Sequence, residues 1–186
     1  MKTNNEIYQE LTISGSVTRD QWDFLYEQTL NQSNNNYNYV EVGSHSGGST
    51  TSLLINIVKN NEDRKVLSID NCIYPEVTRE KFRSNLNKLG LYGPIIEHTI
   101  NSQEFHPGDE LFSLIFLDGD HTEPAVSTEL KIFNNNLIIG GIISGHDYCS
   151  DHPGVVEAVD KFFNSDNDRY EKVECPADMW AYKKIK

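Results

Sequence analysis

The sequence has few cysteines and no long hydrophobic run, and each shortage excludes a class of protein. Three cysteines at wide spacing, an odd number, argue against a disulfide framework or a zinc site and indicate free thiols in a reducing compartment. No run approaches the roughly 20 apolar residues that a membrane span needs. The N-terminal Met-Lys-Thr-Asn-Asn-Glu holds no apolar signal segment, so we expect a cytoplasmic protein with no membrane partner.

Basic residues are also scarce, with 16 Lys and Arg against 28 Asp and Glu and a formal charge of −12 at pH 7. Because phosphate backbones are bound through Lys and Arg, we expect no nucleic-acid partner. The length of 186 residues favours one domain over residues 1–186. We expect an N-terminal helical segment over 1–36 and a binding and catalytic core over 37–186.

Short apolar runs alternate with helical segments, which is typical of βαβ units and a parallel sheet. Strands are predicted at 39–42, 66–69, 95–100, 112–117 and 137–144, the last interrupted by two glycines. Helices are predicted from a capping box at 18–21, from about 48, and over 76–89, 123–133 and 153–163. Two final runs, 170–173 and 180–185, can pair only as an antiparallel hairpin because so few residues join them. The expected fold is a Rossmann-like, doubly wound, seven-stranded α/β sheet with helices on both faces.

Residues 40–50, VEVGSHSGGST, are the most informative stretch. An apolar strand ends in Glu41, a glycine loop follows, and Ser49-Thr50 opens a helix. That arrangement suits a nucleoside ligand at the carboxyl edge of an α/β sheet. The spacing Glu-x-Gly-x-x-x-Gly differs from the Gly-x-Gly-x-x-Gly of dinucleotide-binding proteins.

Polar residues follow the ends of successive predicted strands. Because the carboxyl ends of parallel strands face one crevice, we expect these side chains to share a site. They are Glu41, Asp70, Ser102, Asp118 and the pair His146-Asp147.

Four motifs in order, VEVGSHSGGST, NSQEF, FLDGDH and GGIISGHDY, resemble class I S-adenosylmethionine-dependent methyltransferases. The small metal-assisted O-methyltransferases of the catechol and sugar types are the most similar group. The resemblance runs from Gly15-Ser16-Val17-Thr18 to the terminal hairpin. It implies S-adenosylmethionine as cofactor and O-methylation of a small hydroxylated acceptor, a sugar or a phenol. A second subunit could complete the open crevice, so a homodimer is one expectation.

The resemblance also implies a set of cofactor-binding residues. Gly43 and Glu41 would approach the methionine part, Asp70 would accept bonds from the ribose hydroxyls, and Ser102 would lie beside the adenine. Capping of a helix or loop is the alternative for Ser49 and Ser102, as is turn formation for Asp70. The full set is Glu41, Gly43, Ser44, Ser49, Asp70, Asn71, Ser102 and Asp118.

Asp118, His146 and Asp147 match the divalent-cation ligands of the resembled group, where Mg²⁺ or Mn²⁺ would assist the reaction. His146 departs from the catechol type, which has aspartate there, and a histidine suits Mn²⁺, Fe²⁺ or Zn²⁺ better than Mg²⁺. His121 occupies the position of the general base, with helix capping as its alternative. The expected catalytic residues are therefore His121 and Asp118.

Three other interpretations stay open from the sequence. The same Asp and His cluster could serve a metal-dependent hydrolase or oxygenase on this fold. A nicotinamide-dependent oxidoreductase could use Asp70 for its ribose, although its glycine fingerprint is missing. The chain could also be a non-catalytic cofactor-binding module that needs a partner subunit.

Overall fold

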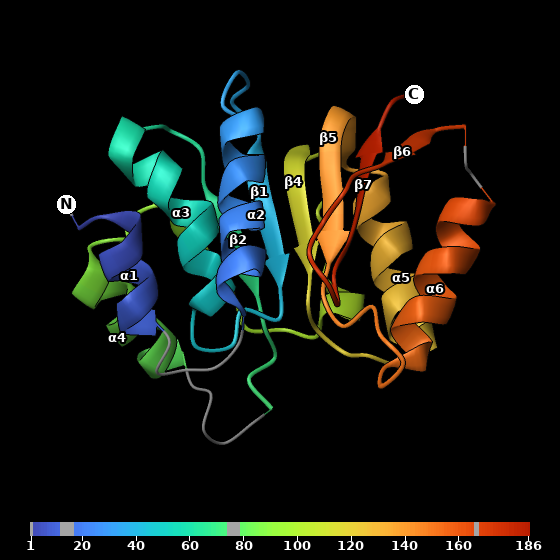
Figure 1. The fold of residues 1–186 in the computed structure, drawn as a ribbon, viewed down its shortest axis with the longest axis horizontal. Helices are drawn as coiled ribbons and strands as arrows, with labels where there is room; N and C mark the ends of the chain where they lie inside the picture. The colour runs from blue at the N-terminus through green and yellow to red at the C-terminus, as the bar shows by residue number, and fades with distance from the viewer. Residues whose placement is uncertain (1, 12–16, 74–78, 166–167) are drawn as a thin grey trace.

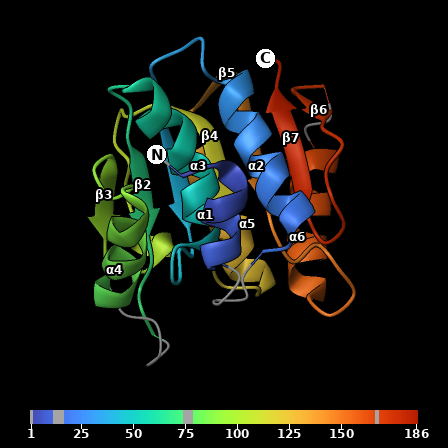
Figure 2. The same cartoon turned by 60° about the vertical axis from the view of Figure 1, so that its left-hand side comes forward.

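The computed structural model describes residues 2–11, 17–73, 79–165 and 168–186. It contains one seven-stranded sheet in the order β3-β2-β1-β4-β5-β7-β6, with helices on both faces (Figures 1 and 2). β1 to β5 are parallel, and β7 runs antiparallel to both β5 and β6. The predicted fold class is confirmed. The strands are β1 (Asn38–Val42), β2 (Val66–Ile69), β3 (Ile95–His98), β4 (Phe112–Leu117), β5 (Leu137–Gly145), β6 (Tyr170–Lys172) and β7 (Trp180–Lys184).

The helices divide between the two faces of the sheet. One buried cluster joins the sheet to α1 to α4, and a second joins it to α5 and α6. The strands therefore alternate between two apolar faces: Leu114 of β4 packs in the first cluster, and its neighbour Ile115 packs in the second. The helices are α1 (Asn4–Leu11), α2 (Arg19–Asn31), α3 (Gly48–Asn60), α4 (Arg79–Leu89), the 3₁₀ helix η1 (Ser102–Glu104), α5 (Glu123–Asn134) and α6 (Pro153–Asn164).

Two predicted strands, β3 and β5, differ from the observed ones by more than a one-residue shift of an end. β3 ends at His98, two residues earlier than predicted. β5 runs unbroken from Leu137 to Gly145, through both glycines. The chain absorbs the glycines by a positive φ of 84° at Gly140 and a shift in the register between β4 and β5, so the strand does not end there. The predicted starts of the helix at 76 and of the family resemblance at 15 lie outside the described residues.

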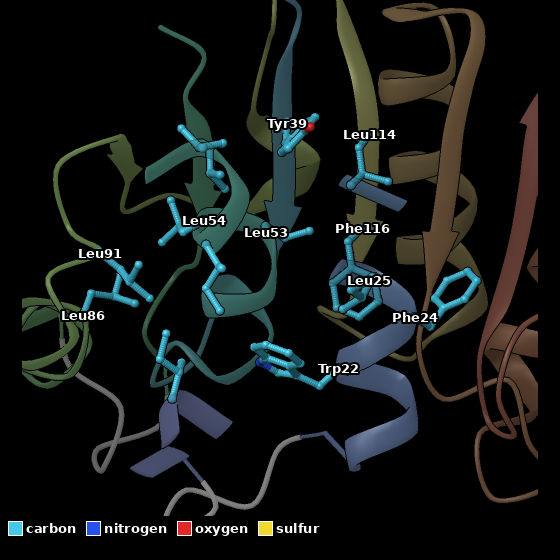
Figure 3. Packing of buried hydrophobic residues seen from close by; sticks show 14 of the residues in the cluster. Trp22, Phe24, Leu25, Tyr39, Leu53, Leu54, Leu86, Leu91, Leu114 and Phe116 are labelled. Carbon is cyan, nitrogen blue, oxygen red and sulfur yellow. The ribbon is translucent and has the colours of Figure 1, made fainter. Parts of the chain in front are cut away.

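α2 is joined to the rest of the fold by its cap and by one tryptophan. Thr18 and Gln21 form the predicted capping box, in which each side chain accepts a hydrogen bond from the other residue's backbone N–H. Trp22 is fully buried and donates from Nε1 to Oγ1 of Thr51 on α3 at 3.0 Å. Figure 3 shows Trp22 and Leu25 in one cluster with the leucines of α3.

In the part of the chain that the structure describes, no helix is long and apolar enough to cross a membrane.

We expect Thr18→Ala to lower the free energy of unfolding by about 1 kcal/mol, because it removes the side chain that caps the first turn of α2. Urea unfolding followed by circular dichroism measures the loss. Ser33→Ala, at an exposed position just beyond the same helix, is the control and should change stability little. Equal stability of the Thr18 variant and the wild type would contradict the role of the cap.

Candidate active site

The loop after β1 meets the end of β4 through backbone alone. Gly43 has a φ of 81°, and a Cβ built on it would lie 1.8 Å from the carbonyl oxygen of Asp118. No other residue fits there without displacing β4. The sheet order reverses between β1 and β4, which is where open α/β sheets leave a crevice for ligands.

A cleft with a volume of about 560 Å³ opens at this point, within the size range of small-ligand sites. Six of the residues predicted from the sequence line it: Gly43, Asp70, Asn71, Ser102, Asp118 and His121. The other five predicted residues lie outside its lining: Glu41, Ser44, Ser49, His146 and Asp147.

Glu41 and Ser49 contact each other beneath the glycine loop. Glu41 is fully buried at the end of β1, and its two carboxylate oxygens accept hydrogen bonds from Ser49 Oγ, at 2.6 Å, and from Thr50 Oγ1. Both donors lie in the first turn of α3. Burial raises the pKa of Glu41 to about 7, although these two hydrogen bonds oppose the shift. These two hydrogen bonds therefore hold the first turn of α3 against the end of β1, outside the lining of the cleft.

Asp70 lies just past β2 with its carboxylate at the cleft. Oδ2 accepts the backbone N–H of His45 at 2.8 Å, and Oδ1 accepts that of Cys72 at 2.7 Å. These bonds hold both flanking loops to one side chain. Each carboxylate oxygen has a further lone pair, so Asp70 can still accept hydrogen bonds from a diol.

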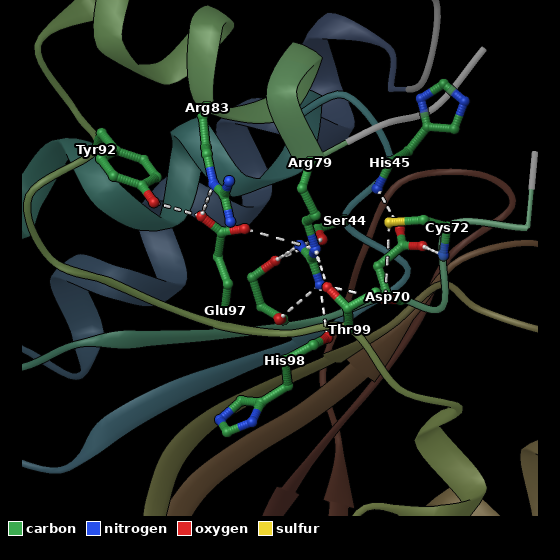
Figure 4. Close-up of polar contacts among 11 residues, drawn as sticks. Ser44, His45, Asp70, Cys72, Arg79, Arg83, Tyr92, Glu97, His98 and Thr99 are labelled. Carbon is green, nitrogen blue, oxygen red and sulfur yellow. Dashed lines mark hydrogen bonds and ion pairs between the residues drawn. The ribbon is translucent and has the colours of Figure 1, made fainter. Parts of the chain in front are cut away.

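Arg79 is a buried cation that the sequence analysis missed. It comes from the start of α4 and donates to Ser68 Oγ at 2.8 Å, to the His98 carbonyl at 2.6 Å and to Ser44 Oγ at 3.3 Å (Figure 4). Ser44 is thus part of this network under the cleft. The guanidinium ties the ends of β2 and β3 together and sets the position of Asp70, whose carbonyl it also contacts. No local pattern marks an arginine for this role.

A second buried carboxyl, also missed from the sequence, lies under the opposite end of the cleft. Glu129 of α5 is 1% exposed and accepts a hydrogen bond from Ser102 Oγ. Burial raises the pKa of Glu129 to about 7. Glu129, which does not line the cleft, therefore positions Ser102 at the start of η1.

His121 and Asp147 form the most direct acid–base contact of the site. His121 Nε2 lies 2.9 Å from Asp147 Oδ2, and this hydrogen bond raises the pKa of His121. In return, the hydrogen bonds from His121 and His146 hold the pKa of Asp147 far below its usual range. Asp147 adopts a left-handed backbone with φ of 57°, which aims its carboxylate at the histidines. An imidazole so placed can accept a proton and share the resulting charge with a carboxylate.

The three expected cation ligands, Asp118, His146 and Asp147, lie close together next to His121. His146 Nδ1 is 3.2 Å from Asp147 Oδ2 and 3.9 Å from Asp118 Oδ1, and one ligand atom from each residue falls within 4.8 Å of the others. Burial and the nearby Asp147 raise the pKa of Asp118 well above its usual range. Two carboxylates crowded in this way are stabilised by a cation between them, so the residues present fit a divalent ion.

His152, which precedes α6, completes a group of three histidines around Asp147. Its Nε2 lies 3.5 Å from Asp147 Oδ1, and its ring packs edge-on against that of His121 at a centroid distance of 4.3 Å. The sequence analysis assigned it no role, because nothing local places residue 152 beside residue 121.

Comparisons with known proteins agree with this geometry. The profile of the methyltransferase domain family matches residues 40–148, more than half of the chain. Among solved structures, the O-methyltransferase NovP has 16% identity and a TM-score of 0.74, over 90% of this chain and 80% of its own. The S-adenosylhomocysteine-bound methyltransferase PaMTH1 of Podospora anserina has 17% identity and a TM-score of 0.69, over 98% and 87%. CalS11, a TDP-rhamnose 3'-O-methyltransferase of calicheamicin biosynthesis, has 13% identity and a TM-score of 0.66, over 98% and 96%. No curated protein matches the sequence significantly.

We expect wild-type stability to fall as the pH rises from about 5 to 8, because the folded state raises the pKa of Glu41 to about 7. A carboxyl with a raised folded pKa stabilises the fold below its unfolded pKa, and that contribution is lost as pH rises through the folded value. Glu41→Gln cannot ionise, so it should lose less stability over this range, by on the order of 3 kcal/mol.

Urea unfolding at pH 5 and pH 8 tests this expectation. Glu104→Gln, at an exposed position, is the control and should keep the wild-type pH dependence. A Glu41 variant with the same pH dependence as the wild type would contradict the assignment.

Proposed function

The chain belongs to the methyltransferase domain family, and we propose that this S-adenosylmethionine-dependent enzyme methylates a hydroxyl group of a small acceptor with the help of a divalent cation. One observation carries the proposal. A candidate ribose acceptor, Asp70, and a carboxylate-supported histidine, His121, line the same cleft at the point where the strand order reverses. A hydroxyl placed between them would meet both the cofactor and a base.

Cofactor binding would use the cleft lining and not the buried pair below it. Asp70 and Asn71 would bind the ribose hydroxyls, and Ser102 would lie beside the adenine. Gly43 would leave room for the methionine part, because any side chain at this position is excluded by Asp118. Glu41, which accepts a hydrogen bond from the Ser49 hydroxyl, would act with Ser49 by holding the glycine loop and α3 in place.

His121 would accept the proton of the acceptor hydroxyl while Asp147 stabilises the resulting imidazolium. When bound, S-adenosylmethionine supplies a methyl group on a positively charged sulfur. Transfer of this methyl group to the acceptor oxygen would form the oxygen–carbon bond and break the carbon–sulfur bond, with the electron pair of that bond left on the sulfur of S-adenosylhomocysteine. Holding the methyl carbon and the oxygen in line would supply much of the acceleration.

Asp118, His146 and Asp147 would hold the divalent cation, Mg²⁺ or Mn²⁺, which supplies a Lewis acid for the acceptor oxygen. The ring nitrogen of His146 that faces the carboxylates is Nδ1, and it would bind the cation. The other ring nitrogen, Nε2, is buried and has no hydrogen-bond partner among the described residues. For the acceptor, the TDP-rhamnose methyltransferase CalS11 supports a sugar hydroxyl, and a phenol is the alternative.

We expect S-adenosylhomocysteine, at about a hundred times its dissociation constant, to raise the melting temperature by roughly 5–10 °C. Asp70→Asn should bind this nucleoside at least about tenfold more weakly, because it loses the anionic acceptor for the ribose diol. Asp109→Asn, at an exposed position away from the cleft, should bind as the wild type does. A shift with NAD or with a metal alone, and none with S-adenosylhomocysteine, would contradict the proposed function.

We expect His121→Ala to lower kcat by about 10²–10⁴-fold while S-adenosylhomocysteine affinity stays within a few-fold. The reason is that the substitution removes the proton acceptor and leaves the nucleoside side of the cleft intact. Methyl transfer to a panel of sugars and phenols measures kcat, and calorimetry measures affinity. His106→Ala, at an exposed position, is the matched control. Full activity of the His121 variant would show that another group is the base.

A further inference from the structure

We propose that His121, Asp147 and His152 form a second metal site, one that binds a transition-metal dication such as Co²⁺ or Zn²⁺ and stops methyl transfer when occupied. The site is distinct from the Asp118, His146 and Asp147 set, although the two share Asp147. Its existence is independent of the proposed function, and only the inhibition rests on that function.

The ligand atoms of the three residues are already at coordination spacing. His121 Nε2 lies 2.9 Å from one oxygen of Asp147, and His152 Nε2 lies 3.5 Å from the other. All three ligand atoms fall within 4.8 Å of one another. Metal–ligand bonds of about 2.0–2.2 Å place neighbouring ligand atoms roughly 3–3.5 Å apart, so little movement would be needed to admit an ion.

The backbone holds the two histidines in this arrangement. α6 begins against the chain that carries His121: a Cβ built on Gly154 would lie 2.6 Å from the His121 carbonyl oxygen and 2.7 Å from the Glu123 nitrogen. Only a glycine permits this approach, which places His152, two residues earlier, against His121. Because the contact is between backbones, the pair is held together without a ligand.

The chemistry of the donors selects the class of metal. Two imidazoles and one carboxylate suit Zn²⁺ or Co²⁺, whereas Mg²⁺ prefers oxygen ligands. His121 and His152 are 39% and 34% exposed and both line the cleft, so an ion has a path to them. Asp120 and Asp151 also line this part of the cleft and add negative charge that attracts a cation.

Occupation of this site would remove the base of the proposed reaction. In the proposed reaction Nε2 of His121 donates to Asp147, so the acceptor's proton would go to Nδ1. A metal on Nε2 displaces the hydrogen there and leaves the ring's one remaining proton on Nδ1, so the ring has no lone pair left to accept the acceptor's proton. The ion would also bind the carboxylate of Asp147, which the Asp118, His146 and Asp147 set needs as a ligand. Mg²⁺, which binds imidazole weakly, would leave His121 available.

The site is tested by titrating chelator-treated protein with Co²⁺, without cofactor or acceptor, and following the visible absorption of the bound ion. We expect one ion per chain in the wild type, and at least tenfold weaker binding in both His152→Ala and His152→Gln. His146→Ala should bind within a few-fold of the wild type, as should the surface control His106→Ala. Circular dichroism verifies that each variant is folded, and using two substitutions at residue 152 protects the test against a misfolded one.

Two outcomes would overturn the site: no Co²⁺ binding by the wild type, or weak binding by His146→Ala with unchanged binding by both His152 variants. The second outcome would place the ion on the Asp118, His146 and Asp147 set. Neither result depends on methyl transfer, so failure of the proposed function leaves this test intact.

The inhibition is tested by adding Zn²⁺ to turnover assays that contain excess Mg²⁺. We expect half-inhibition of His152→Gln to need at least tenfold more Zn²⁺ than half-inhibition of the wild type. Full wild-type turnover at a Zn²⁺ concentration that saturates binding would overturn the inhibitory role and leave only the metal site.

Discussion

The close approach of Gly43 to the carbonyl of Asp118 is the constraint on which the site depends. β1 and β4 are neighbours in the sheet, and the chain leaves them toward opposite faces, to α3 and to α5. A side chain at residue 43 would force the two strand ends apart. Because the contact is made by backbone atoms, no side chain fills the space beside it. The cleft opens there and is lined by Asp70 and His121.

Buried ionisable groups support this cleft from below on both sides. Glu41 holds the first turn of α3, Arg79 joins the ends of β2 and β3, and Glu129 holds Ser102. The side chains of these three residues all have hydrogen-bond partners, as the desolvation of a buried charged group requires. The two glutamates lower the stability of the fold when they are charged, as their raised pKa values show, and all three side chains position the loops that line the cleft.

Three histidines share the two carboxylate oxygens of Asp147, which makes it the centre of the polar cluster at this end of the cleft. The proposed base, His121, and the expected cation ligand, His146, both contact Oδ2, while His152 approaches Oδ1. In the proposed reaction this one carboxylate would couple proton transfer to metal binding. The imidazole that carried a metal would then decide whether His121 is free to accept a proton, so the identity of the divalent ion would matter to the proposed activity.

The sequence alone determined the order of the elements and the edge of the sheet at which the polar strand ends meet. Alternating apolar runs and the C-terminal hairpin predicted the sheet, and Gly43, Asp70, Ser102, Asp118 and His121 were all expected in the one cleft that they line. The sheet and the strand-end residues depend on local periodicity and on the rule that parallel strands end together, whereas Gly43 and His121 were expected there from the family resemblance.

Only the tertiary structure decided which polar groups face the cleft and which lie beneath it. Glu41 and Ser49 occupy motif positions, yet Ser49 Oγ donates a hydrogen bond to the Glu41 carboxylate and not to the cleft. Arg79 and Glu129 come from distant helices, and His152 comes from the residue that precedes α6. Local pattern cannot reveal such pairs, because long-range packing sets them. The clearest case is the backbone contact between Gly154 and His121, which brings two histidines 31 positions apart into one site.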